Sequence, residues 1–310
     1  MASGPLPAWA AACFFVSGAA GLIYEVAWSK QLAYLLGNSL HAAATVVAAF
    51  LAGLALGARF LGVPLARRAN GARIYALLEV GIALLGLLSL PVLRGLDPLV
   101  GSLYRSLGGE TGAFGFARVL LLSALLLPPA TLMGSTLPVL VATFERSLVG
   151  PALARLYAVN TFGAVAGSVI AGFALLPGVG LLAATWIAAA LNAVAAALAW
   201  TSSRRSRPAQ VATAKAPAPR SATGPEPLGR GERIAVALLF GLSGFGALAF
   251  QIAWMRLFGL VFGSSVYSFS AVLGVYLLGL AAGSAAIGRA LRRGGSLLGF
   301  GALQLALATT

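Results

Sequence analysis

The sequence predicts an all-α fold, a polytopic bundle of transmembrane helices. Of its 310 residues, 60% are hydrophobic and only 9% are charged, whereas a soluble globular domain carries about 25% charged residues. The apolar residues form long continuous runs and lack the alternating pattern of a membrane β-barrel. These observations exclude an ordinary soluble enzyme, a disordered chain and a fibrous protein.

The apolar runs are long enough to cross a bilayer several times. A hydrocarbon core of about 30 Å needs about 20 mostly apolar residues per helix. We expect eight full spans at residues 8–29, 40–63, 74–93, 115–140, 157–177, 180–200, 233–254 and 265–288, followed by a partial ninth at 296–310. An apolar helix that stops in mid-membrane is unusual, so we expect the sequence to be a fragment of a longer protein.

The positive charges predict the orientation of these spans. The formal net charge is +14, and 16 of the 21 Lys and Arg residues fall on the N-terminal side of the predicted membrane. The other five are Lys30, Arg94, Arg105, Arg118 and Arg256. Because cytoplasmic loops carry an excess of positive charge, we expect a bacterial inner-membrane protein with a cytoplasmic N-terminus. The basic residues are spread over four loops, which argues against nucleic acid as a partner.

A polar segment divides the chain into unequal parts. Residues 201–232 are basic and rich in Pro and Ala, and no apolar periodicity runs through them. This composition is typical of a flexible linker, which the predicted topology places in the cytoplasm. Residues 1–200 then form a first six-helix membrane half, and residues 233–310 begin an incomplete second half.

The second half repeats the beginning of the first. Residues 17–62 align with 243–288 at a constant offset of 226, with 14 identities in 46 positions. Trp28 pairs with Trp254, and Lys30 pairs with Arg256, so the positive charge is kept. Six spans separate the copies, so both enter the membrane in the same direction. A parallel internal repeat of this kind is typical of major-facilitator (MFS) transporters.

Five residues are the candidates for ligand binding: Glu25, Lys30, Asn160, Gln251 and Arg256. A carboxylate in mid-membrane costs about 2.5–3.5 kcal/mol on insertion scales and needs a partner or an aqueous cavity. Glu25 therefore either binds a cation, such as an amine or a proton, or is a hydrated carboxylate near the interface. We expect it to line the main cavity and face the second half, where its repeat partner Gln251 keeps hydrogen bonding without the charge.

Other polar and small residues have structural interpretations. Glu79 is expected to be hydrated near the cytoplasmic interface, and Trp28 and Trp254 are expected in an aromatic belt. Gly163, Gly167 and Ala171 recur every four residues and predict a close helix contact. Asn160, at the head of this stripe, is a candidate for an interhelical hydrogen bond or a substrate contact.

The sequence offers no basis for a catalytic or metal site. With one cysteine, Cys13, and one histidine, His41, neither an intramolecular disulfide nor a histidine- or cysteine-clustered metal centre is expected. We predict no cofactor, no metal and no catalytic residue in this chain.

Four ordered motifs resemble the membrane region of bacterial fused MFS/spermidine-synthase proteins. They are SGAAGLIYEVAWSKQL (17–32), GNSLHAAATVVAAFLAGLALGA (37–58), LPPATLMGSTLPVL (127–140) and LYAVNTFGAVAGSVIAGFALLP (156–177). The resemblance covers about residues 12–290. It implies a membrane domain that precedes a soluble, Rossmann-like aminopropyltransferase domain, and a link to polyamine metabolism.

The sequence departs from that family in one respect. It contains no glycine-rich nucleotide loop followed by acidic residues, so we do not expect this chain to transfer aminopropyl groups itself. The resemblance implies a multi-pass domain that anchors or serves a synthase-like enzyme domain absent from the sequence. The alternative is a major-facilitator-type transporter of a small solute, with a polyamine or another cation as one candidate.

Overall fold

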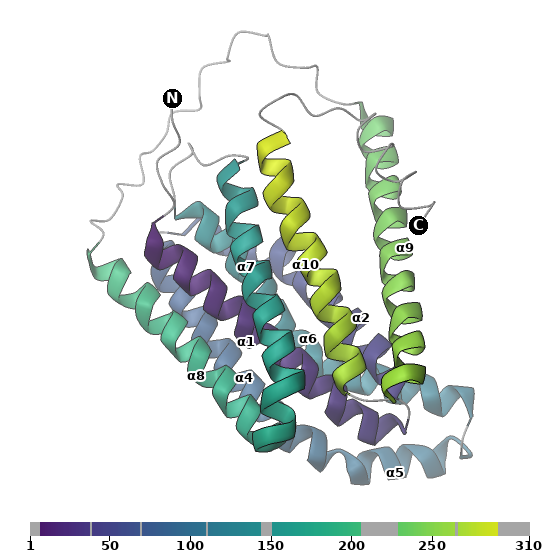
Figure 1. The fold of residues 1–310 in the computed structure, drawn as a ribbon. Coiled ribbons are helices and arrows are strands. Elements are labelled where there is room, and N and C mark those ends of the chain that lie inside the picture. Colours follow the sequence, from purple (N-terminus) through teal and green to yellow (C-terminus); the bar gives the residue numbers. More distant parts are fainter. Residues whose placement is uncertain are drawn as a thin grey trace.

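The computed structural model is a bundle of long helices, and it describes residues 7–37, 39–68, 70–109, 111–143, 151–205, 229–263 and 266–290 (Figure 1). These ranges contain helices and no strand. The helices are α1 (Ala8–Leu36), α2 (Ser39–Leu56), η1 (Gly57–Gly62), α3 (Val63–Ala66), α4 (Gly71–Gly95), α5 (Asp97–Ser106), α6 (Gly112–Ala142), α7 (Pro151–Ile170), η3 (Ala171–Leu175), α8 (Leu176–Arg205), α9 (Arg230–Phe262) and α10 (Val266–Ala290). The predicted partial span at 296–310 and most of the predicted linker lie outside the described residues.

Seven helical segments in the described ranges are long and apolar enough to cross a membrane. One of them, Arg155–Arg204, has 50 residues and would be about 75 Å long if straight, more than twice the thickness of a bilayer core. It changes direction at Gly180, whose φ of 78° and ψ of 176° interrupt the helix. The predicted spans 157–177 and 180–200 both fall in this segment, so the eight full spans expected from the sequence correspond to seven apolar segments.

Helix α1 occupies the centre of the bundle. It packs against α2, α7 and α8, and most of its residues between Gly18 and Leu32 are buried. Helix α9, in contrast, lies at the edge of the bundle (Figure 1) and exposes large apolar side chains along most of its length. The short helix α5 lies across the end of the bundle where α1 ends, and none of its residues is buried.

Glycine allows the backbones of α1 and α7 to touch. A Cβ atom at Gly163 would collide with the carbonyl group of Phe15, and one at Gly167 would collide with the backbone of Ala19. Gly18 of α1 makes the reciprocal contact with the backbone of Asn160. The predicted small-residue contact is therefore confirmed, and its partner is α1.

A second close contact joins α2 and η1 to α6. Cβ atoms at Gly53 and Gly57 would overlap Ala130 and the carbonyl group of Thr131, and a Cβ atom at Gly134 would overlap the backbone of Leu54. Helix α6 continues without a break from Gly112 to Ala142, although it contains three prolines. Glycines on both helices therefore set this distance.

The ends of α1 and α9 occupy corresponding positions of the aligned segments 17–62 and 243–288. Helix α1 ends at Leu36 and is followed by Gly37 at φ 67°, and α9 ends at Phe262 and is followed by Gly263 at φ 77°. A positive φ is readily adopted by glycine alone, because a Cβ atom would strain the backbone there. Each helix is thus followed by a glycine at corresponding positions of the two aligned segments, 17–62 and 243–288.

Replacing Gly167 by alanine should destabilise the protein, because the new methyl group cannot fit between α7 and the backbone of α1. We expect the Gly167→Ala variant to unfold at a clearly lower temperature in detergent, with a loss of about 1–3 kcal/mol. The matched control is Gly241→Ala on α9, where nothing lies within 4 Å of the added atom. Alanine has the higher helix propensity, so the control should be neutral or slightly more stable; equal losses in both variants would contradict the packing argument.

Candidate functional site

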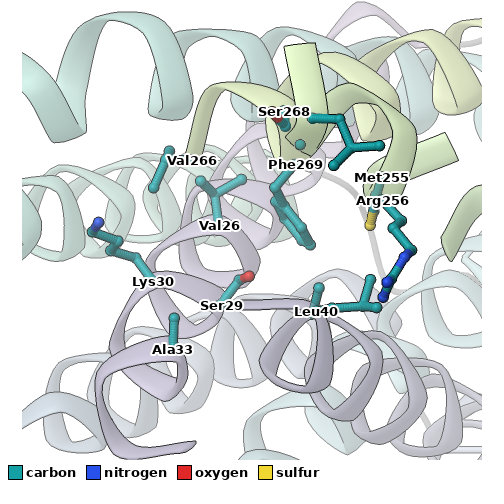
Figure 2. A pocket seen from close by; sticks show the side chains of 13 residues that line it. Val26, Ser29, Lys30, Ala33, Leu40, Met255, Arg256, Val266, Ser268 and Phe269 are labelled. Carbon is teal, nitrogen blue, oxygen red and sulfur yellow. The ribbon is translucent and has the colours of Figure 1, made fainter. Parts of the chain in front are cut away.

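A cavity of about 270 Å³ lies between the end of α1, the start of α2, the end of α9 and the start of α10. Its polar lining consists of Lys30 and Ser29 from α1, Arg256 from α9 and Ser268 from α10. Figure 2 shows Lys30 and Arg256 on opposite sides of the cavity, with Ser29 and Phe269 between them. Two of the five predicted ligand-binding residues are therefore brought to one cavity.

The helical periodicity of α1 explains which of its side chains line this cavity. Val26, Ser29, Lys30 and Ala33 line it, and their spacing of three and four residues places them on one face of the helix. Glu25 is beside this face and is not among the lining residues. Glu25 therefore does not line this cavity, because its position on the helix places it among the buried residues of the bundle; the prediction that it lines the main cavity gains no support from this site.

Glu25 and Gln251 are both buried without a hydrogen-bonding partner. The exposed fraction is 4% for Glu25 and 3% for Gln251. Within the described residues, no hydrogen bond or ion pair involves Glu25, and the side-chain nitrogen of Gln251 also has no partner. Their role in ligand binding stays a prediction, since the structure contains no ligand.

Asn160 lies at the crossing of α1 and α7 and is separate from the cavity. Its backbone contacts Gly18, and its side-chain oxygen would lie 2.9 Å from a Cβ atom built there. The residue is half-buried and is not among the lining residues. The structure thus places Asn160 in a helix contact and does not bring it together with Lys30 and Arg256.

A buried polar network joins α1, α4 and α8 around Glu79. The hydroxyl group of Ser17 donates a hydrogen bond to Glu79 Oε1 at 2.6 Å, and Asn192 Nδ2 donates to Glu79 Oε2 at 2.7 Å. The hydroxyl group of Tyr75, one turn before Glu79, donates to the carbonyl oxygen of Cys13 at 3.3 Å. The carboxylate is thus held by neutral donors from two other helices.

The prediction that Glu79 is hydrated at the interface is wrong, because its side chain is fully buried. Residues Ala72, Tyr75, Ala76, Glu79 and Ile82 of α4 are all buried, and their spacing of three and four residues defines the face that packs inward. This periodicity was present in the sequence. The partners Ser17 and Asn192 come from distant parts of the chain, and sequence reasoning did not identify them.

The environment of Trp28 also differs from the predicted one. It is fully buried, its indole nitrogen donates a hydrogen bond to Ser89 Oγ at 2.8 Å, and its ring stacks on Tyr24 at 5.6 Å. It therefore belongs to the core of the bundle and not to an interfacial belt. Trp254, with which Trp28 aligns in the sequence, is 52% exposed, so the two tryptophans have different environments.

The described residues include no group of three or more His, Cys, Asp or Glu side chains that could hold a metal ion. The polar groups of the cavity are two cations and two hydroxyl groups. The fold and this site define a helical, membrane-type protein with a small basic cavity at one end of the bundle.

Comparison with known proteins gives a distant relationship. No family model and no solved structure matches the chain. Over 188 residues it is 30% identical to a protein of Streptomyces coelicolor named polyamine aminopropyltransferase 2. The aligned region covers 59% of this chain and 32% of that protein, so the match extends over about a third of the relative's length.

Replacing Glu79 by leucine should destabilise the bundle, because it removes the acceptor of two hydrogen bonds and leaves buried donors unpaired. At ~0.6 kcal/mol for each membrane-protein hydrogen bond, we expect Glu79→Leu to lose about 1 kcal/mol or more, measured by unfolding in mixed micelles. Glu25→Leu is the matched control, since it replaces a buried carboxylate that has no such partners. It should be neutral or stabilising. A greater loss of stability for Glu25→Leu than for Glu79→Leu would contradict the conclusion that the hydrogen bonds of Glu79 stabilise the bundle.

Proposed function

We propose that this chain is the multi-pass membrane domain of a spermidine-synthase-like fused protein, and that it anchors or serves a polyamine-related enzyme domain. The observation that carries the proposal is the match to the Streptomyces coelicolor protein, whose name gives a polyamine aminopropyltransferase activity. The long apolar helices support it, because any 188-residue stretch of this chain includes several of them. The shared region therefore contains long apolar helices.

The proposed orientation has the N-terminus in the cytoplasm of a bacterial inner membrane, with α5 outside. Five of the 21 Lys and Arg residues are then on the outer side, in accord with the positive-inside rule. The bend at Gly180 supports counting α7 and α8 as two crossings. The equivalent ends of α1 and α9 support the proposed duplication of major-facilitator type.

Cysteine labelling tests this orientation. In a Cys13→Ser background we expect Ser102→Cys, on the exposed α5, to react in intact cells with a maleimide that cannot cross membranes. Thr201→Cys, at the other end of the bundle on α8, should react only after the cells are opened. Labelling of Thr201→Cys in intact cells, with protection of Ser102→Cys, would reverse the topology.

The enzyme-serving role is tested in the native cells by deleting the codons for residues 8–290 while keeping the reading frame. We expect aminopropyltransferase activity to move from the membrane pellet to the soluble fraction, because the anchor is gone. An unrelated inner-membrane enzyme serves as the fractionation control. The proposal would be rejected if the activity were already soluble in the parent strain and its distribution did not change on deletion.

A transporter of a small solute is the second candidate. The cavity favours it, because helices from both proposed halves contribute to the lining. Uptake of labelled spermidine and, separately, of labelled phosphate by vesicles containing the purified chain, compared with empty vesicles, separates the two functions; uptake of neither solute argues against the transporter. The charge of the cavity opposes a cationic solute.

A further inference from the structure

The cavity between α1, α2, α9 and α10 is electrostatically positive. Lys30 and Arg256 line it, and no Asp or Glu is among the described lining residues. Neither cation forms an ion pair with a described residue. The nitrogen of Lys30 lies 5.0 Å from the centre of the Tyr34 ring, a contact that leaves the charge uncompensated.

The hydroxyl group of Ser29 adds an unused donor between the two cations. Ser29 is only 7% exposed, and it makes no hydrogen bond within the described part of the chain. Ser268 is different, because its hydroxyl group already donates to the carbonyl oxygen of Gly263 at 3.0 Å. Because Ser29 lines the cavity, its hydroxyl group is available to donate a hydrogen bond to a ligand there.

The location of the two cations is also unusual. In the proposed orientation they belong to the five positive charges on the outer side, where the topology disfavours them. They occupy equivalent positions of the repeat and keep their charge, although only 14 of the 46 aligned positions are identical. Both then line the same cavity, as expected if the charge itself is required there.

The size of the cavity limits the ligand. A volume of about 270 Å³ is that of about nine water molecules at roughly 30 Å³ each. This is enough for a phosphate group but less than the 300–1,000 Å³ of a pocket that encloses a drug-sized molecule. A larger ligand could place its anionic group inside.

We propose that this cavity binds an oxyanion, a phosphate group held between Lys30 and Arg256 with Ser29 as a hydrogen-bond donor. Arginine and lysine are the side chains that bind phosphate oxygens most strongly. The group belongs either to a free solute or to a phospholipid of the outer leaflet. The inference rests on the proposed membrane domain and its orientation, but it does not require the enzyme partner.

Thermal unfolding of the purified chain in uncharged detergent tests the proposal. We expect inorganic phosphate, titrated at constant ionic strength, to raise the Tm of the wild type in a saturable way. Lys30→Gln and Arg256→Gln should each weaken the apparent affinity about tenfold, the effect of losing one charge-assisted hydrogen bond. Arg105→Gln is the matched control, because Arg105 is on the same side of the membrane and outside the cavity.

Charge-conserving variants separate the loss of charge from a loss of folding. Lys30→Arg and Arg256→Lys should keep the response to phosphate, even if the glutamine variants are less stable.

A second arm of the experiment compares the thermal stability of the chain in vesicles of phosphatidylglycerol with its stability in vesicles of phosphatidylcholine. Stabilisation by phosphatidylglycerol alone, dependent on Lys30 and Arg256, would identify the lipid as the source of the phosphate group.

Three outcomes would overturn the proposal. The first is an equal phosphate response in the wild type and in a Lys30→Gln/Arg256→Gln double variant. The second is no response to either phosphate or phosphatidylglycerol, and the third is stabilisation by spermidine that depends on the two cations. The proposal that the domain anchors or serves an enzyme is tested separately, by the distribution of aminopropyltransferase activity between membrane and soluble fractions. Failure of the oxyanion site and failure of the anchoring function are therefore distinguishable.

Discussion

The contact between the backbones of α1 and α7 is the constraint on which the rest of the structure depends. Gly18 on α1 and Gly163 and Gly167 on α7 remove the side chains that would separate the helices. In a bilayer the lipid is as apolar as the helix surface, so close van der Waals packing replaces the hydrophobic effect as the attraction between helices. Because α1 also packs against α2 and α8, its position determines the position of its neighbours.

Hydrogen bonds then fix how the neighbouring helices are rotated. Glu79 accepts hydrogen bonds from Ser17 on α1 and Asn192 on α8, and Trp28 donates to Ser89 on α4. Each bond turns a polar side chain away from lipid, where an unpaired group would be costly. The glycines thus set the distances between helices, and the polar network sets which faces of α4 and α8 point inward.

The basic cavity follows from the same arrangement. Lys30 is half-buried between the buried residues Ser29 and Gln31 of α1, and it lines the space between the ends of α1 and α9. Helix α9 contributes Arg256, which aligns with Lys30 in the sequence. Because the cavity is lined by two cations and two hydroxyl groups, the ligand proposed for it is an anion and not a cationic polyamine. This separates the ligand of the cavity from the substrate implied by the relative.

The sequence by itself determined the helical membrane class, because a chain with 9% charged residues cannot cover a water-facing surface. The spacing of Gly163 and Gly167 also predicted their helix contact, and the alignment of the two segments pairs Lys30 with Arg256. Only the tertiary structure decided that Glu79 and Trp28 are buried and that Glu25 is beside the cavity face. Those environments depend on the rotation of each helix and on partners such as Asn192, 113 residues from Glu79, and no local pattern specifies contacts at that separation.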